Sequence, residues 1–395
     1  MKRIVRELVS ELSRRLARAP NLLQVVVGPR QVGKTTAVRQ VVEQWKGPTL
    51  YASADLPVPP EATWVETHWE LARQRARAAR RKTLLVLDEV QKVPRWSEGV
   101  KGQFDRDRAE GAHVRAVLLS SSSLSVGQGV KESLAGRFES HFCPHWSWPE
   151  CKAALGWSLD KWLYFGGYPG AAELIRQPER WASHVIESLI EAVPSRDVLT
   201  MTHVSKPALL RQLFMLATRG PAQLLSYNKM LGQLQDAGNT VTLAHYLRLL
   251  SSAYLVSGLG LWSGGVVRQR ASSPKLILWN NALVTAPSGL SFAESKARPD
   301  WWGRLVENAV GAHLLNRMGP GVEVTYWRDG NLEVDFVLQR GARIVALEVK
   351  SGAPGDPRGL AAFSRRVPTA KRLVVGNGGI PLDEFFATEP DEWLR

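Results

Sequence analysis

The sequence predicts an α/β protein whose N-terminal part forms a mostly parallel sheet with helices on both faces. Three features indicate this fold: five short apolar runs, a glycine-rich loop after the first run, and two carboxylates directly after the third. Alternation of strands and helices favours a parallel sheet, which binds its ligands at the carboxyl ends of the strands. Helical stretches or polar loops separate the five predicted strands, which cover residues 23–27, 48–52, 83–87, 114–119 and 138–143.

The chain begins with a helical pattern. Apolar residues recur at helical spacing over residues 1–18, which predicts an amphipathic helix. The first strand, 23–27, follows, and a second helical pattern covers 37–45. The loop between this strand and this helix therefore lies at the carboxyl edge of the sheet.

That loop has the sequence G-x-x-x-x-G-K-[ST], which is typical of a phosphate-binding loop when a strand precedes it and a helix follows. Gly28 and Gly33 allow the backbone to turn its N–H groups toward phosphate oxygens. Lys34 is expected to reach the β and γ phosphates, and the Thr35 hydroxyl to hold Mg²⁺. The predicted nucleotide-binding residues of the loop are Gly28, Pro29, Arg30, Gln31, Val32, Gly33, Lys34, Thr35 and Thr36.

Two carboxylates end the third predicted strand. Asp88 follows the apolar run 84–87 and is expected to bind Mg²⁺, directly or through water. Glu89 is expected to act as the general base that polarises the attacking water. Together with the phosphate loop, this pair predicts hydrolysis of a nucleoside triphosphate, with ATP as substrate and Mg²⁺ as cofactor.

The middle of the chain is predicted to be helical. Helical patterns cover about 150–205 and are broken by the glycine-rich stretch 166–170. Residues 206–270 resemble a helix-turn-helix followed by a hairpin, with one helix from Lys206, a second capped by Ser226 and a third begun by Thr242. Segments 254–256 and 259–262 are expected to form the hairpin, or wing. Compact helical packing without DNA contact is the alternative.

The C-terminal part carries a second candidate site. Residues 332–338 alternate as a strand with Asp335 on its polar face, and 343–350 form a second strand with Glu348 and Lys350 on one face. Two carboxylates and a lysine on adjacent strands predict a Mg²⁺ site with a cation that polarises water. Glu307, on a preceding helix that Asp300 is expected to cap, adds a further carboxylate. An exposed hairpin with a cross-strand Glu–Lys pair is the alternative.

Composition limits the class of protein. At 395 residues, with 44% hydrophobic and 22% charged residues, the chain is long enough for two or three domains and is not a disordered protein. The only cysteines, Cys143 and Cys151, exclude a disulfide framework and predict a reducing compartment. Neither a secretion segment nor an apolar run near the roughly 20 residues of a membrane span is present, which predicts a cytoplasmic protein without a membrane partner.

The charge favours a polyanionic partner. A formal net charge of +14 and a pI of about 10 point to nucleic acid before membrane. The basic residues are unevenly placed, because one predicted helix and its end carry a run of cations with no acid among them. This run predicts either a solvated helix face or a nucleic-acid contact, and it consists of Arg73, Arg75, Arg77, Arg80, Arg81 and Lys82.

Motifs along most of the chain resemble a family of prokaryotic AAA+-type ATPases whose C-terminal region is similar to restriction-endonuclease-like PD-(D/E)-x-K nucleases. The resemblance begins with GPRQVGKTT at 28–36 and LDEVQKVP at 87–94. It continues through GGYP at 166–169 and ends with EVDF at 333–336 and EVKS at 348–351. The other motifs that carry it are SSSSL at 120–124, LAGR at 134–137, SRDV at 195–198 and LVEN at 305–308.

The resemblance implies further site residues and an assembly. Ser121 or Ser122 takes the sensor position that contacts the γ-phosphate or the attacking water. Arg137 takes the position of the arginine finger, which stabilises transition-state charge in a neighbouring subunit. The active form is then a homo-oligomer, possibly a ring. The alternative for Arg137 is a surface ion pair.

The sequence departs from the family pattern in three places, one of which is the fifth-strand region 142–148, where the family has a plainer apolar–Pro–apolar–Ser pattern. The stretch 166–170 lacks the arginine that many AAA+ proteins place at the start of the lid. Asn280 and Asn281 stand where relatives often carry an acidic residue. The nuclease-like residues Glu307, Asp335, Glu348 and Lys350 are all present.

The predicted organisation has four parts: an AAA+-type ATPase domain at 1–150, a helical lid or linker at 151–205, a winged-helix-like segment at 206–272 and a restriction-endonuclease-like domain at 273–395. The predicted function is a Mg²⁺-dependent ATPase that couples ATP binding and hydrolysis to engagement, remodelling or cleavage of nucleic acid, most readily DNA. The alternative is a nucleotide-dependent regulatory switch or scaffold whose C-terminal domain binds DNA or a partner protein without cleaving.

Overall fold

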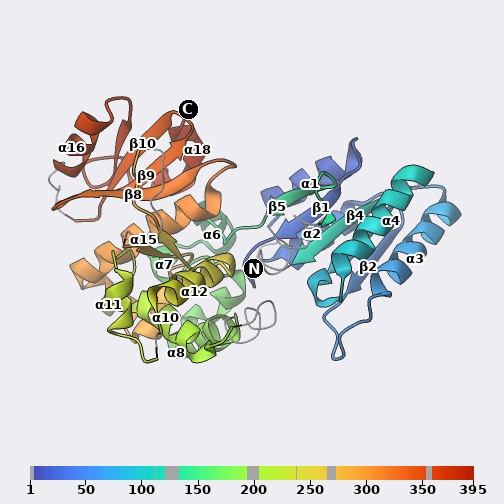
Figure 1. Ribbon diagram of the computed structural model, residues 1–395, viewed down its shortest axis with the longest axis horizontal. Coiled ribbons are helices and arrows are strands. Elements are labelled where there is room, and N and C mark those ends of the chain that lie inside the picture. Colours follow the sequence, from blue (N-terminus) through green and yellow to red (C-terminus); the bar gives the residue numbers. More distant parts are fainter. Residues whose placement is uncertain are drawn as a thin grey trace. The chain divides into compact units, whose positions relative to one another are not determined.

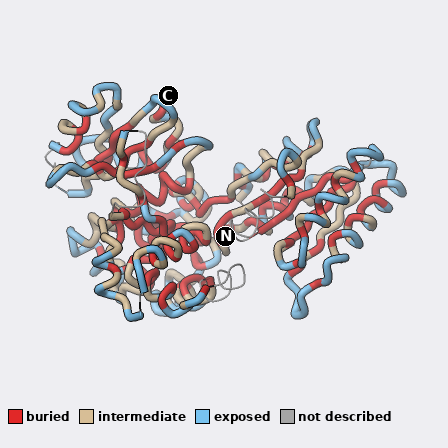
Figure 2. Tube along the Cα trace, in the orientation of Figure 1, coloured by how far each residue is buried: buried red, intermediate tan, exposed pale blue. Residues whose placement is uncertain are grey.

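The computed structural model describes residues 4–111, 113–120, 133–193, 204–236, 238–264, 273–352 and 358–395. The chain divides into two compact units, one from Arg3 to Cys143 and the other from Pro144 to Arg395 (Figure 1). Each unit has its own sheet and its own buried core, which appears as the red trace in Figure 2.

The first unit is built on a five-stranded sheet in which every neighbouring pair is parallel, with the strand order β2-β3-β4-β1-β5. Each strand lies within one residue of a predicted apolar run at both ends, which confirms the predicted α/β fold. The strands are β1 (Leu23–Val27), β2 (Thr49–Ser53), β3 (Thr83–Asp88), β4 (Val114–Ser120) and β5 (Phe138–Phe142).

Helices cover both faces of this sheet, as predicted. On one face, α1 (Glu7–Ala17) and α2 (Lys34–Gln44) pack against alternate strand residues such as Val26, Leu84 and Val117. On the other face, α3 (Trp64–Ala79) and α4 (Trp96–Glu110) pack against the intervening residues, such as Val25 and Leu85. Because both faces are buried, the strands read as continuous apolar runs.

The basic run of α3 is only partly solvated. Arg73 is 2% exposed, and its Nε lies 2.6 Å from Oδ1 of Asp107 on α4. Trp69 Nε1 donates a hydrogen bond of 2.7 Å to the other oxygen of the same carboxylate. Arg73 therefore belongs to a buried polar contact between α3 and α4 and is not part of an open nucleic-acid contact, whereas Arg77 and Lys82 are exposed.

The N-terminal half of the second unit is helical. Ser226 accepts a hydrogen bond from the backbone N–H of Lys229 and caps α11, as predicted. The cap of α12 is Asn239, so this helix begins at Thr240 and not at Thr242. The α-helices are α6 (Trp148–Leu155), α7 (Leu159–Phe165), α8 (Pro178–Val185), α10 (Pro207–Arg219), α11 (Tyr227–Leu231) and α12 (Thr240–Ser252).

The predicted hairpin between 254–256 and 259–262 does not form, so the prediction of a wing there is wrong. Residues 256–259 form a single strand, β6 (Val256–Leu259), whose antiparallel partner is β7 (Lys275–Leu278). Leu261, which was expected in the second strand of the hairpin, instead forms a bridge to Tyr326 of the C-terminal sheet. The pairing partner of 256–259 is thus distant in sequence and not the adjacent segment.

The C-terminal half contains a four-stranded sheet in the order β11-β10-β9-β8, with β10 and β11 parallel and the other pairs antiparallel. The long helix α15 precedes the sheet, and α16 connects β10 to β11. Pro299 begins α15, and Asp300 lies in its first turn without capping it. The elements are α13 (Ala282–Thr285), α14 (Phe292–Lys296), α15 (Pro299–Arg317), β8 (Glu323–Asp329), β9 (Leu332–Arg340), β10 (Arg343–Lys350), α16 (Arg358–Arg366), β11 (Lys371–Gly376), α17 (Leu382–Ala387) and α18 (Pro390–Trp393).

Within the described ranges, no helix is both long enough and apolar enough to cross a membrane.

Candidate functional site

The phosphate loop lies at the carboxyl edge of the first sheet, between β1 and α2. Gly28 has a φ of 152°, and a Cβ atom there would lie 2.2 Å from the carbonyl oxygen of Cys143. Gly33 precedes α2 with a φ of 92°, in the left-handed range that glycine tolerates. The two glycines therefore allow a tight loop whose backbone approaches a neighbouring strand end and then enters a helix.

Lys34 points back into the loop. Its ammonium donates hydrogen bonds to the carbonyl oxygens of Gly28, at 2.8 Å, and Pro29, at 2.5 Å. Only 8% of the residue is exposed, and this burial lowers the pKa of Lys34 to about 8, although the nearby Cys143, Glu89 and Asp88 raise it in part. The loop thus holds a buried cation beside backbone that approaches a helix N-terminus, which suits phosphate.

Arg6 supports the loop from outside. This residue precedes α1 and is 7% exposed, and its Nη1 lies 3.2 Å from the carbonyl oxygen of Val32 and 3.0 Å from Sγ of Cys143. Arg6 therefore connects the N-terminal segment to the phosphate loop and to the end of β5. The sequence patterns did not single it out, because its partners are distant in the chain.

Asp88 ends β3 beside the start of α2. Its Oδ2 accepts a hydrogen bond from the Tyr51 hydroxyl of β2 and lies 3.4 Å from Oγ1 of Thr35. The pKa of Tyr51 is raised by burial and by this carboxylate. Thr35 and Asp88 therefore converge, as predicted, in the pairing that P-loop enzymes use for Mg²⁺.

Glu89 follows in a left-handed backbone conformation, with a φ of 52°. Burial raises the pKa of its carboxyl group, and a hydrogen bond donated by Gln91 Nε2 lowers it in part. A carboxylate with a raised pKa beside the phosphate loop suits a general base. Thr35, Asp88 and Glu89 therefore fit a nucleotide with Mg²⁺.

Two further predicted residues have different outcomes. Ser121 and Ser122 lie outside the described residues. Arg137 precedes β5, and both its Nε and Nη2 donate to the carboxylate of Asp105 on α4. Within one chain, Arg137 therefore forms the surface ion pair that was the alternative to an arginine finger.

The C-terminal candidate residues come together, but around a lysine. Lys275 of β7 is fully buried, and its Nζ lies 2.6 Å from Oε1 of Glu307 on α15 and 3.2 Å from Oδ1 of Asp335 on β9. It also lies 3.2 Å from Oε1 of Glu333 and 3.3 Å from the backbone oxygen of Asp335. Burial and the nearby Asp335 carboxylate together raise the pKa of Glu307 to about 7, although Lys275 lowers it in part.

Glu348 and Lys350 lie beside this cluster on β10. Lys350 Nζ donates to Glu348 Oε1 at 2.7 Å, and burial raises the pKa of Glu348. The backbone N–H of Val349 donates to Oδ2 of Asp335 at 2.8 Å. Both oxygens of Asp335 thus already have partners, one from Lys275 and one from the backbone.

These C-terminal residues do not fit a divalent metal. The Lys275 ammonium occupies the position between the Glu307 and Asp335 carboxylates where a metal ion would have to bind. Mg²⁺ in that position would need oxygens at about 2.0–2.1 Å. In the described part of the chain, no group of three or more His, Cys, Asp or Glu side chains has an arrangement that could hold a metal ion. No local sequence pattern distinguishes Lys275, because its carboxylate partners are distant in the chain.

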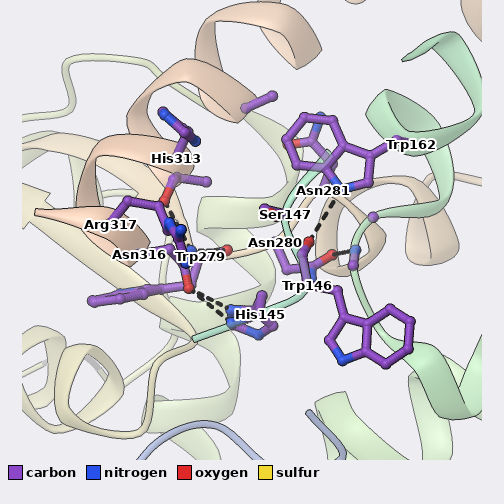
Figure 3. Close-up of a pocket in the computed structure, with 14 residues that line it drawn as sticks. His145, Trp146, Ser147, Trp162, Trp279, Asn280, Asn281, His313, Asn316 and Arg317 are labelled. Carbon is purple, nitrogen blue, oxygen red and sulfur yellow. Dashed lines mark hydrogen bonds between the residues drawn. The ribbon is translucent and has the colours of Figure 1, made fainter. Parts of the chain in front are cut away.

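A cavity of about 30 Å³ lies elsewhere in the second unit, and Figure 3 shows the side chains that line it. Asn316 Oδ1 accepts hydrogen bonds from the backbone N–H and from Nδ1 of His145, and Asn316 Nδ2 donates to the carbonyl of Trp279. This volume holds on the order of one water molecule, which excludes a nucleotide.

Three buried asparagines near this cavity form a polar layer. Asn281 Nδ2 donates to the carbonyls of Leu163 and Leu305, and Asn308 Nδ2 donates to Asn281 Oδ1. Asn280 Oδ1 accepts from the backbone N–H of Ala282. The layer connects α7, the β7–α13 turn and α15, so the asparagines at the positions of the family's acidic residue have a structural role here.

Comparisons with known protein families match three successive segments. Residues 21–152 match an AAA domain, residues 156–294 match a domain of unknown function (DUF8612), and residues 302–384 match a second domain of unknown function (DUF4143). None of the curated proteins matches the chain.

Several solved structures are similar. A Walker-type ATPase of Pyrococcus abyssi is 12% identical, with a TM-score of 0.46 over 70% of this chain and 93% of that one. The Orc1 protein of Aeropyrum pernix, solved in complex with DNA, is 14% identical, with a TM-score of 0.33 over 72% and 92%. DnaA of Aquifex aeolicus, solved with AMPPCP, is 17% identical, with a TM-score of 0.33 over 63% and 89%.

The AAA-domain match and the observed sheet agree with the loop geometry. The first unit has the P-loop NTPase fold, and residues 21–152 match the AAA-domain family model. The matches to the second unit carry no described activity.

Proposed function

We propose that the protein binds ATP with Mg²⁺ at the loop between β1 and α2 and hydrolyses it with Glu89 as the general base. The observation that carries this proposal is the convergence of Lys34, Thr35, Asp88 and Glu89 at one edge of the sheet. Mg²⁺ would supply positive charge to the phosphates, and Thr35 and Asp88 are the residues that would hold it.

The chain's own side chains perform the remaining steps. Lys34 exchanges its contacts with two loop carbonyls for phosphate oxygens. The backbone N–H groups of the loop orient the triphosphate. Glu89 accepts the proton of the attacking water, and its raised pKa improves it as a base near neutral pH.

The test measures phosphate release and nucleotide binding by the full-length protein. Lys34→Ala is expected to abolish both, whereas Glu89→Gln is expected to retain ATP binding and slow turnover by about 10²–10⁴-fold. Two exposed residues of α4 provide matched controls, Lys101→Ala and Glu98→Gln, which should match the wild type. Equal turnover by the wild type and Glu89→Gln would exclude Glu89 as the base.

We also propose that the protein engages nucleic acid, and a groove of about 770 Å³ on the first unit favours this function. Its rim carries four cations, Lys46, Arg80, Arg81 and Lys82, and none of its described lining residues is acidic. In the described ranges, no carboxylate lies within ion-pair distance of any of the four. We call these four residues the basic rim.

The basic rim lies at the amino edge of the sheet, opposite the phosphate loop, because its residues directly precede β2 and β3. Trp45 lies beside it and donates its indole N–H to the carbonyl of Lys82 at 3.1 Å. Cations without a carboxylate partner suit the phosphates of single-stranded nucleic acid, and an aromatic ring beside them suits its bases. Cations also stabilise helix C-termini, and both α2 and α3 end here.

Fluorescence anisotropy with labelled single-stranded DNA at several salt concentrations separates these roles. Replacing the basic rim by alanine should weaken binding and reduce the slope of log affinity against log salt by up to about 3. A control variant removes four exposed lysines elsewhere, Lys101, Lys152, Lys161 and Lys229. If both variants lose the same affinity, the rim is only part of a general positive field.

The C-terminal sheet favours the scaffold alternative over cleavage. Its carboxylates are held by a lysine and do not fit a metal. Tightly retained nucleotide with slow turnover would support a nucleotide-dependent switch. Fast turnover stimulated by DNA would instead support a remodelling ATPase.

A further inference from the structure

The Lys275 ammonium lies where the carboxylates of the C-terminal sheet converge. Four oxygens from α15 and β9 surround it at 2.6–3.3 Å: Oε1 of Glu307, Oε1 of Glu333, and Oδ1 and the backbone oxygen of Asp335. The ring of Phe336 lies on another side, with its centroid 5.1 Å from Nζ. Lys275 has no exposed surface, so this ammonium is a built part of the core.

These distances lie close to the usual N–H···O hydrogen-bond range of about 2.7–3.2 Å. A divalent ion that bound the same oxygens at 2.0–2.6 Å would occupy the volume of Nζ. It would also lie against a buried positive charge, which repels it strongly in a medium of low dielectric constant. The lysine and the metal therefore exclude each other.

We propose that Lys275 is the permanent cation of this cluster, so that the C-terminal sheet holds no divalent metal and cuts no nucleic acid. The ammonium neutralises the negative charge of the carboxylates, as a bound metal ion would in a cluster of this kind. This inference is independent of the ATPase proposal, because every residue involved belongs to the second unit.

One carboxylate oxygen beside the cluster has a different environment. Oε2 of Glu348 is buried without a hydrogen-bond partner in the described part of the chain. Its other oxygen accepts from Lys350. A single carboxylate oxygen beside Lys350 is a poor site for Mg²⁺, which demands near-octahedral coordination by oxygens. Removal of Lys275 would make room for a metal ion, because Glu307, Glu333 and Asp335 would then lose their shared cation.

The cluster also joins two parts of the second unit. Lys275 belongs to the segment that matches one family model, and its three carboxylate partners belong to the segment that matches another. The lysine therefore anchors β7 to α15 and β9 by charge. A loosely held surface lysine would not be placed in this way.

The experiment uses Mn²⁺ as the probe and the full-length protein without nucleotide. Mn²⁺ binding is followed by electron paramagnetic resonance and by the thermal transition of the protein. The wild type should bind no Mn²⁺ at this cluster, and Asp335→Asn should leave Mn²⁺ binding unchanged. Lys275→Met should be less thermostable, should recover stability on addition of Mn²⁺, and should bind Mn²⁺ roughly tenfold more tightly or better.

Three further measurements make the result decisive. Adding Asp335→Asn to Lys275→Met should abolish the gained Mn²⁺ affinity. Lys371→Met, a change at an exposed lysine of β11, should bind Mn²⁺ no better than the wild type. Normal ATP hydrolysis by Lys275→Met would show that the first unit remains folded.

The proposal is overturned if the wild type binds Mn²⁺ and Asp335→Asn loses it, or if the wild type cleaves DNA with Mg²⁺ or Mn²⁺ and Asp335→Asn does not. If Lys275→Met does not fold, the wild type and Asp335→Asn still decide the question. In that pair, a loss of thermostability without any change in Mn²⁺ binding supports the lysine as the resident cation.

Discussion

Arg137 donates two hydrogen bonds to the carboxylate of Asp105, from Nε to Oδ1 at 2.7 Å and from Nη2 to Oδ2 at 3.0 Å. The Arg137 guanidinium lowers the pKa of Asp105, so the pair stays charged over the physiological range. An arginine finger must leave such a partner to reach a neighbouring subunit. The two roles predicted from the sequence, finger and ion pair, are therefore alternatives that one experiment separates.

We expect Arg137→Ala to lower ATP turnover by about 10³-fold or more without loss of ATP binding, if the residue acts in a neighbouring subunit. Mixing Arg137→Ala with Glu89→Gln should then restore activity, because mixed assemblies contain sites with both residues intact. A structural ion pair predicts a different result. Turnover would be unchanged in Arg137→Ala, and mixing the two variants would restore no activity. Arg137→Ala and Asp105→Asn would lower the stability of the protein by similar small amounts.

The buried Lys34 predicts a pH dependence of nucleotide binding. In the free protein its pKa is lowered to about 8, so the ammonium is about half deprotonated at that pH. Triphosphate favours the ammonium, so binding near pH 8 takes up a proton, and affinity should fall by up to about tenfold per pH unit above it. Calorimetry in two buffers of different ionisation enthalpy should report this uptake near pH 8 and much less near about pH 6.

Lys34→Arg is the matched control for this measurement. A guanidinium stays protonated, so the weaker binding expected of this variant should carry no proton uptake near pH 8. Identical binding enthalpies in both buffers for the wild type would contradict a lowered pKa at Lys34.

The close approach at Gly28 predicts a specific loss. In Gly28→Ala the new methyl group would lie 2.2 Å from the carbonyl oxygen of Cys143, so the loop must move. We expect ATP binding to be lost and stability to fall by about 1–3 kcal/mol. Gly102→Ala, in α4 with open space around it, should instead gain about 0.5–1 kcal/mol. Isothermal titration and urea unfolding measure both, and retained ATP affinity in Gly28→Ala would show that the loop adapts.

The buried pair of Arg73 and Asp107 predicts a strong stability effect. Arg73→Met leaves the Asp107 carboxylate buried with the Trp69 indole as a remaining partner, which should cost about 3–5 kcal/mol. The double change Arg73→Met with Asp107→Leu should cost less, because no lone charge remains. Arg77→Met, on the same helix but exposed, should stay within about 0.5 kcal/mol. Urea unfolding of the four proteins tests the ranking, and a double variant less stable than the single one would argue against charge burial as the cause.

Local signals predicted the first unit well. The strand residues are apolar on both faces because helices cover both, so each strand was visible as a run. The phosphate loop is a contiguous motif, and Asp88 and Glu89 end a strand next to β4, so their convergence with Lys34 and Thr35 followed from the parallel order. Burial of Arg73 was not predictable, because its partner Asp107 lies on a different helix.

Long-range pairing explains the errors in the second unit. A hairpin was expected between 254–256 and 259–262, but β6 pairs with β7, which lies beyond the segment expected as its partner. The three acidic candidates were predicted to share a site, and Glu307 and Asp335 do. The cation between them comes from β7, and a lone lysine in an apolar strand carries no signal of its partners.

The asparagine layer decides how this protein can be dissected. Asn308 of α15 donates to Asn281, and Asn281 donates to the carbonyl of Leu305 on α15, so separating the chain between residues 294 and 302 would remove hydrogen bonds from both fragments. Each fragment would then expose backbone and side-chain polar groups whose hydrogen-bond partners lie in the other fragment. The two family matches thus meet at a boundary in the sequence that is not a domain boundary in the folded protein. Shortened versions for crystallography or pull-down work should keep residues 144–395 intact.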